Sequence, residues 1–144
     1  MFKTMLICSD GSGNALKAAQ KGIAMAKEQN ACVLLLNIES AGMQNYTVPW
    51  QLEVGSAVTV PQITAQQEAN QDKVKMLCEQ TGVRYRYRQE CGHAAEQIVR
   101  VAEEEDVDLI VMGSRGLSEW KALLLGSVSS HVLHHAPCSV LIVR

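Results

Sequence analysis

The chain is organised around the stretch Gly113-Ser-Arg-Gly-Leu-Ser-Glu-Trp-Lys-Ala-Leu-Leu-Leu-Gly-Ser127. It begins where an apolar run, residues 109–112, stops at a glycine, and it ends with Gly-Ser directly before a short amphipathic segment. This order predicts a strand, a loop and the start of a helix. Glycines let the backbone approach a ligand with no Cβ in the way, and a helix N-terminus presents unpaired N–H groups with a partial positive charge. The stretch therefore predicts a binding site for an anion.

Predicted strands and helices alternate along the whole sequence. Short apolar or alternating runs predict strands at residues 4–8, 33–38, 83–88, 109–112 and 139–143. Helical periodicity predicts helices at residues 12–29, 66–80, 93–105 and 127–135. Because right-handed crossovers place each helix over the sheet, the pattern predicts an α/β fold with a parallel sheet between two helical layers. With 144 residues, the chain is expected to form one domain.

Residues 83–88 alternate strictly between apolar residues and arginine. This alternation predicts an edge strand whose three arginines, Arg84, Arg86 and Arg88, face water and guard the edge by charge. The next predicted helix ends on four acids, Glu103–Asp106, which oppose the helix dipole. Solubility is the interpretation that the sequence offers for them. Residues 39–62 show no sustained period, and a loop of this length is typical of a lid, a contact surface or disorder.

Composition excludes several classes of protein. A hydrophobic content of 47% with 19% charged residues indicates a soluble globular chain, and a net charge of −2 argues against general nucleic-acid binding. No apolar run approaches the ~20 residues that span a bilayer, so the protein is not expected to be membrane-embedded. The N-terminus turns polar too soon for a signal peptide, and the five cysteines include no Cys-x-x-Cys pair. A cytoplasmic location is therefore expected.

Three motifs resemble the universal stress protein family, in its ATP-binding branch. The first is the spacing of Gly113, two residues, Gly116, nine residues, and then Gly126-Ser127; the second is Ser9-Asp10-Gly11-Ser12; the third is the C-terminal stretch 126–144. The resemblance covers nearly the whole chain, residues 1–144. It implies a three-layer, doubly wound sheet with strand order 3-2-1-4-5, similar to adenine nucleotide alpha hydrolases. In that order the winding reverses between strands 1 and 4, so a crevice opens at their carboxyl ends.

Asp10 and Gly113 are expected to meet in this crevice. Backbone N–H groups around the glycines, with the Ser127 hydroxyl, would hold the phosphates of a nucleotide. The resemblance implies that adenine lies near Ile38 and that Val128 joins the phosphate loop, whereas Cys8 and Ser9 stand where the family often has other small residues or proline. The expected nucleotide-binding residues are Cys8, Ser9, Asp10, Ser12, Ile38, Met112, Gly113, Arg115, Gly116, Gly126, Ser127, Val128 and Ser129.

The sequence leaves two roles open for Asp10. It could hold ribose hydroxyls or a Mg²⁺ ion that bridges to the phosphates, or it could cap the first helix together with Ser12. The expected cofactors are accordingly ATP and Mg²⁺, with Asp10 as the metal residue.

The expected function is a nucleotide-dependent stress-response or regulatory module that acts on an unidentified protein partner. The alternative is a dimeric interaction module of the same fold that binds no nucleotide. A dinucleotide-binding oxidoreductase fits poorly because Leu16 occupies the third glycine position, and a P-loop enzyme fits poorly because Gly126 stands where its lysine should be. No nucleophile–base pair or carboxylate dyad is readable near the glycine loop, so an enzyme is not expected. Slow ATP hydrolysis or self-phosphorylation stays open.

The final predicted strand, Ser139–Val143, is apolar and carries no charge until Arg144. An apolar edge strand left open invites pairing with another chain. A two-fold homodimer through this strand consumes the edge, the family resemblance implies the same arrangement, and a larger assembly stays open.

Overall fold

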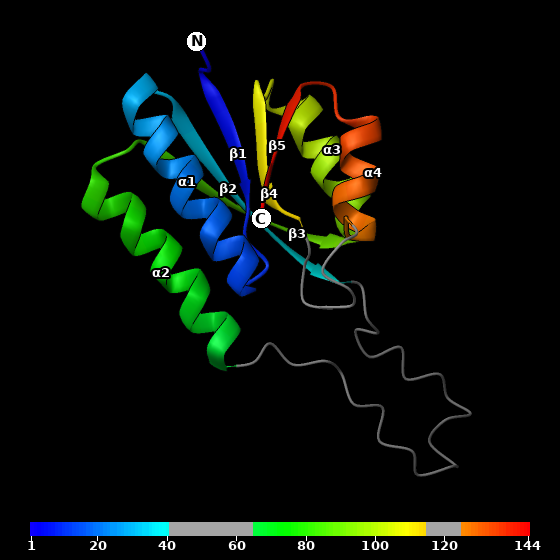
Figure 1. Ribbon diagram of the computed structural model, residues 1–144, viewed down its shortest axis with the longest axis horizontal. Coiled ribbons are helices and arrows are strands. Elements are labelled where there is room, and N and C mark those ends of the chain that lie inside the picture. The colour runs from blue at the N-terminus through cyan, green and yellow to red at the C-terminus, as the bar shows by residue number, and fades with distance from the viewer. Residues whose placement is uncertain (41–64, 115–124) are drawn as a thin grey trace.

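The computed structural model describes residues 1–40, 65–114 and 125–144 (Figure 1). The loop expected at residues 39–62 therefore falls almost entirely outside the described residues, as do Arg115 and Gly116. The elements in chain order are β1 (Thr4–Cys8), α1 (Gly13–Gln29), β2 (Cys32–Ser40), α2 (Ala65–Thr81), β3 (Tyr85–Gly92), α3 (Ala94–Glu104), β4 (Leu109–Gly113), α4 (Ser127–His135) and β5 (Ser139–Val143).

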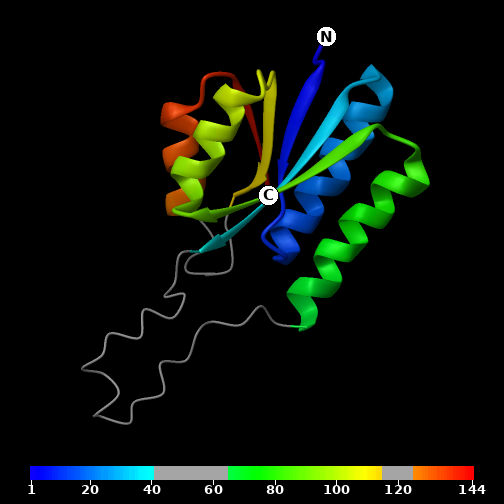
Figure 2. The ribbon, with the colours of Figure 1, turned by 180° about the vertical axis from the view of Figure 1, so that it is seen from behind.

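The strands form one five-stranded sheet in the order β3-β2-β1-β4-β5. Every neighbouring pair is parallel. Helices α1 and α2 cover one face and α3 and α4 the other (Figures 1 and 2). The predicted three-layer, doubly wound fold is thus confirmed, and β1 pairs with β2 on one side and β4 on the other, at the reversal of the winding.

The sheet separates two apolar cores. Met5 and Ile7 of β1 pack toward α1 and α2, whereas Leu6 packs with Ile110 toward α3 and α4. These β1 side chains are fully buried, as expected for a central parallel strand covered on both faces. Gly22 lets α1 lie close to the sheet, because a Cβ there would stand 2.8 Å from Cδ1 of Ile7. The absence of a side chain at Gly22 therefore lets α1 pack closely on the sheet.

Strand β3 differs from the prediction in its limits and in its charges. It begins at Tyr85 and runs on to Gly92, because β2 also continues to Ser40 and pairs with it along that length. Arg86 and Arg88 do not simply face water. Arg86 Nη2 lies 2.9 Å from Glu105 Oε2, and Arg88 Nη2 lies 2.7 Å from Glu104 Oε2.

The acids at the end of α3 are therefore partners of arginines. Arg88 also pairs with Glu90, and Arg100 of α3 pairs with Glu90 and Glu104. Hydrogen bonds from Arg88 and then Arg100 hold the pKa of the Glu104 carboxyl below its usual range. The solubility interpretation is wrong for Glu104 and Glu105, because their partners lie on a strand that only the fold brings beside them. Each exposed ion pair contributes little to the free energy of unfolding. The main effect of the network is to link the side chains of β3 to the end of α3.

Candidate functional site

The predicted site residues gather at the carboxyl ends of β1, β2 and β4. Cys8, Ile38 and Val128 pack against one apolar cluster, and that cluster contains Met112. These side chains come from β1, β2, α4 and β4 respectively. The fold thus brings four of the predicted residues to the same face of the sheet.

The turn between β1 and α1 is held in a defined shape. The backbone N–H of Ser9 donates to the carbonyl of Leu36 on β2, at 2.9 Å. The backbone N–H of Ser12 donates to Asp10 Oδ1 at 2.8 Å, and the N–H of Ala15 donates to Ser12 Oγ at 3.1 Å. Ser12 therefore caps α1, and Asp10 contributes by fixing the turn that leads into the cap. This bond uses Oδ1 of Asp10, and a carboxylate has acceptor capacity on both oxygens, so it is compatible with ligand binding.

Gly113 brings the end of β4 into contact with the start of α1. A Cβ on Gly113 would lie 3.0 Å from Asn14 Cβ and 3.1 Å from the Asn14 carbonyl carbon. This spacing is tighter than ordinary van der Waals contact, so a side chain at residue 113 would push the two segments apart. The end of β4 at Gly113 and the first turn of α1, which follows Asp10, thus lie side by side, as the strand order predicts.

The glycine loop is closed at its base. The N–H of Gly126 donates to the carbonyl of Ser114 at 2.8 Å, and Ser129 Oγ donates to the same carbonyl at 2.7 Å. The N–H of Ser114 in turn donates to Val143 of β5 at 2.9 Å. Ser129 is buried, and its hydroxyl is engaged within this base. Ser129 therefore shapes the loop by tying its two ends together, a role that sequence reasoning did not assign to it.

The N-terminus of α4 lies at this same end of the sheet, because α4 is the element that leads on from β4. The helix begins at Ser127, which is exposed, and its N-cap is Gly126, which has no side chain to cap it. The first N–H groups of a helix have no partner within the helix. The N–H groups of residues 127–129 therefore need partners from outside α4, and the exposed Ser127 hydroxyl lies on the same turn.

The thiol of Cys8, at the end of β1, is expected to be unreactive. Burial, and then the nearby Asp10 carboxylate, raise the pKa of its thiol far above the ordinary value. A thiol that stays protonated is neither a nucleophile nor a good metal ligand. Among the described residues, no group of three or more His, Cys, Asp or Glu side chains is arranged to hold a metal ion.

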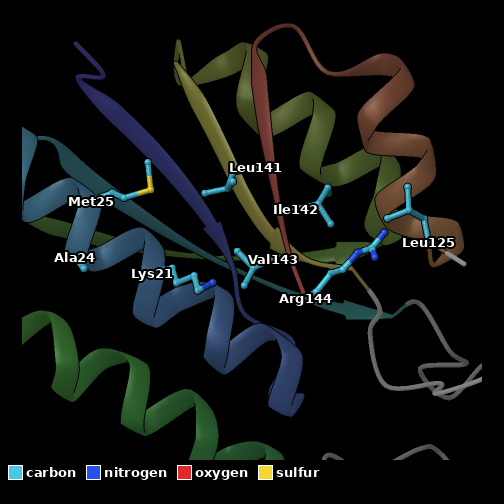
Figure 3. Close-up of a pocket in the computed structure, with 8 residues that line it drawn as sticks. All are labelled: Lys21, Ala24, Met25, Leu125, Leu141, Ile142, Val143 and Arg144. Carbon is cyan, nitrogen blue, oxygen red and sulfur yellow. The ribbon is translucent and has the colours of Figure 1, made fainter. Parts of the chain in front are cut away.

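A groove runs along β5, beside α1 (Figure 3). Its volume is about 800 Å³, and its lining residues are Lys21, Ala24 and Met25 of α1, Leu125, and residues 141–144. The sequence identified β5 as an apolar edge but not the hollow beside it. Within the described part of the chain, none of the helices has the length and apolar character needed to cross a membrane.

Known proteins of one family match this chain. The universal stress protein family matches residues 1–144. Universal stress protein YxiE of Bacillus subtilis is 33% identical over 153 aligned positions, which cover 100% of both chains. A universal stress protein of Methanocaldococcus jannaschii is 34% identical over 146 positions, which cover 100% of this chain and 83% of the relative.

Solved structures of the same fold include proteins with a bound nucleotide. Hypothetical protein MJ0577 aligns with a TM-score of 0.75 and 27% identity, over 99% of this chain and 96% of that one. A universal stress protein in complex with cAMP aligns with a TM-score of 0.69 and 24% identity, over 99% and 97% of the two chains. An Arabidopsis thaliana protein of the family, with AMP bound, aligns with a TM-score of 0.63 and 17% identity, over 97% and 90%.

Proposed function

This chain belongs to the universal stress protein family, and from that premise we propose that it binds ATP, with Mg²⁺, in the cleft where β1, β4 and α4 meet. The observation that carries the proposal is the start of α4. Its N-cap is a glycine with no capping side chain, and it stands beside a glycine loop whose base is closed. Such a terminus is suited to hold phosphate.

The phosphates would be bound mainly by α4. The charge of a helix terminus contributes roughly 0.3–2 kcal/mol toward an anion, and hydrogen bonds to a charged group are stronger than neutral ones. Ser127 would add its hydroxyl. The adenine would lie toward Ile38, which is half-buried at the end of β2.

Mg²⁺ fits the cleft only together with the nucleotide. This ion is commonly held by one or two carboxylates plus the phosphates of a substrate. Asp10 supplies one carboxylate, and phosphate oxygens would supply further ligands. The neighbours solved with cAMP and AMP support the proposal in a limited way, because they are proteins of this fold that hold an adenine nucleotide. The preference for ATP rests on the glycine loop and Asp10 of this chain.

We expect the site to bind nucleotide as a regulatory signal, without turnover, in a stress-response module that acts on a protein partner. Hydrolysis of radiolabelled ATP at a rate above the buffer blank would contradict a purely binding role.

The test of the proposal is a titration with ATP and Mg²⁺, followed by calorimetry and by thermal melting. We expect one site per chain. At a hundredfold excess of ligand over its dissociation constant, binding adds about 2.7 kcal/mol to stability, or roughly 5–10 °C in melting temperature for a chain of this size. A melting curve that millimolar ATP and Mg²⁺ leave unchanged would count against nucleotide binding and in favour of a module that works only through partners.

A homodimer through β5 is the second part of the proposal. The edge strand is apolar, and the groove beside it is lined by Met25 and Leu141 with Lys21 and Arg144 among the lining residues. Antiparallel pairing of β5 with its copy would cover the β5 edge of each subunit. A specific interface buries about 800 Å² per partner. Leu141→Lys should give monomers in light scattering, whereas Arg86→Ser at the opposite edge should not. A wild-type protein that is monomeric at micromolar concentration would contradict this part alone.

A further inference from the structure

The first half of α2 is attached to the rest of the protein by amide side chains. Residues 65–69 of this helix are exposed or half-buried, and its buried apolar residues, Val74 and Cys78, lie further along. Asn70 is buried as well, with 7% of its surface exposed. A helix end with little apolar burial opens easily, so the hydrogen bonds of its amides decide how firmly it is held.

Asn70 reaches the turn between β1 and α1. Its Nδ2 donates to the carbonyl of Gly11 at 2.9 Å, and its Oδ1 accepts from Gln66 Nε2 at 3.1 Å. Both ends of the amide are therefore engaged, which fixes its orientation. Gly11 is the middle residue between Asp10 and Ser12, whose own hydrogen bond closes the turn.

The backbone of α2 also lies directly on this turn. Gly11 has a φ of +80°, in the left-handed region that favours glycine, and a Cβ there would lie 2.7 Å from the carbonyl oxygen of Gln67. The turn is thus held from one side by its own Asx bond and from the other by α2. Displacing α2 would release the Gly11 carbonyl and with it the orientation of Asp10.

We propose that Asn70 is a positioning residue that couples α2 to the nucleotide site. It holds the Asp10–Ser12 turn in the geometry that binds ligand, and a bound nucleotide that fixes the turn stabilises the first half of α2 in return. Coupling between two sites is reciprocal by thermodynamic necessity. The inference rests on the proposed nucleotide binding, and it makes α2 the element through which occupancy of the site reaches the surface.

Gln71 provides a matched control on the same helix. It is the next residue, it is also an amide, and its Nε2 donates to Asn37 Oδ1 at 3.0 Å. That bond ties α2 to β2 and does not touch the turn. A general weakening of α2 should therefore follow from Gln71→Leu, whereas loss of the coupling should follow only from a change at Asn70.

The first measurement is made without nucleotide. Amide exchange by NMR should become faster at Ser12 in Asn70→Leu and stay at the wild-type rate in Gln71→Leu, with circular dichroism to verify folding. Asn70→Asp is the second variant if the leucine variant does not fold, because it keeps the acceptor for Gln66 and removes the donor to Gly11. Equal Ser12 exchange in the wild type and the Asn70 variants would overturn the coupling whether or not ATP binds.

The second measurement adds ATP and Mg²⁺. Affinity should fall about tenfold in the Asn70 variants, the scale of losing one buried hydrogen bond, and should change less than about twofold in Gln71→Leu. ATP should slow exchange at residues 65–73 in the wild type and in Gln71→Leu but not in the Asn70 variants. Wild-type affinity with no slowing at residues 65–73 would contradict the coupling and leave the proposed function standing. An absence of ATP binding in the wild type would contradict the proposed function itself.

Discussion

Helices α1 and α4 begin at the same end of the sheet, and their N-termini differ in how they are capped. Helix α1 follows β1, and its first turn is capped by the Ser12 hydroxyl, while the Asp10 carboxylate accepts from the N–H of Ser12. Helix α4 follows β4, and its N-cap is Gly126, without a side chain. The partial positive charge is the same at both termini. Helix α1 is thus completed by its own residues, whereas the proposed function needs the N-terminus of α4 to be open to a ligand.

The largest effect is expected at Gly113, which lies against the first turn of α1 and directly precedes Ser114, the residue bonded to the N-cap of α4. Gly113→Val should push the first turn of α1 away, because even a Cβ would lie 3.0 Å from Asn14 Cβ. We expect a loss of roughly 1–3 kcal/mol in unfolding free energy from overpacking, together with a loss of ATP affinity. Chemical denaturation and calorimetry measure the two losses. A variant of wild-type stability and affinity would show that the contact does not shape the cleft.

Removing the hydroxyl at the open terminus should affect binding alone. Ser127→Ala leaves the helix cap unchanged, because the N-cap residue is Gly126. ATP affinity should fall by about 10- to 150-fold, since a hydrogen bond to a charged group is worth about 1.5–3 kcal/mol. The melting temperature without ligand should move by less than about 2 °C. A large loss of stability without ligand would mean that Ser127 is structural, and the contrast with α1 would disappear.

The same change at the closed terminus should affect stability first. Ser12→Ala removes the acceptor for the Ala15 N–H, and the loss of an N-cap costs about 1 kcal/mol. Thermal melting without ligand measures this cost, and Ser12→Asp, which keeps a capping oxygen, serves as the rescue variant. A Ser12→Ala protein with wild-type stability would mean that α1 does not depend on its cap.

A change at Asp108, at the opposite end of the sheet, should alter stability without altering ATP affinity. Asp108 Oδ2 accepts from the N–H groups of Lys3 and Thr4 at 2.7 and 2.8 Å, and these bonds, that to Thr4 first, lower the pKa of its carboxyl. A lowered folded-state pKa means that its stabilisation is complete above the ordinary carboxyl range and is lost as the pH falls through the folded value. Asp108→Asn should therefore flatten the acid side of the stability curve. Its ATP affinity at neutral pH should equal that of the wild type, which separates general stability from the site.

The fold could be predicted from the sequence almost completely, because period and turn residues are local signals. The five strands and four helices appear where they were expected, and the resemblance supplied their order. The length of β3 was missed because it depends on how far β2 continues beside it. The site was predicted as a set of positions, of which Cys8, Ile38, Met112 and Val128 share one apolar cluster and Gly113 lies against the first turn of α1.

What the sequence could not supply is which polar groups meet across space. The acids Glu104 and Glu105 looked like a solvated end of α3 until β3 placed arginines beside them. The first half of α2 is rich in polar residues, yet Asn70 is buried against Gly11. Ser129 looked like a ligand residue, and its hydroxyl closes the loop base. Each of these partnerships joins residues from different elements, so no local pattern could predict them.

The most direct test of the central claim is an NMR titration of isotopically labelled protein with ATP and Mg²⁺. If α4 is the open terminus, the amide signals of Ser127, Val128 and Ser129 should shift most, with smaller shifts at residues 13–16 in the first turn of α1. Shifts confined to that turn of α1 or to the groove lined by Met25 and Leu141, or an absence of shifts at millimolar ATP, would contradict the account.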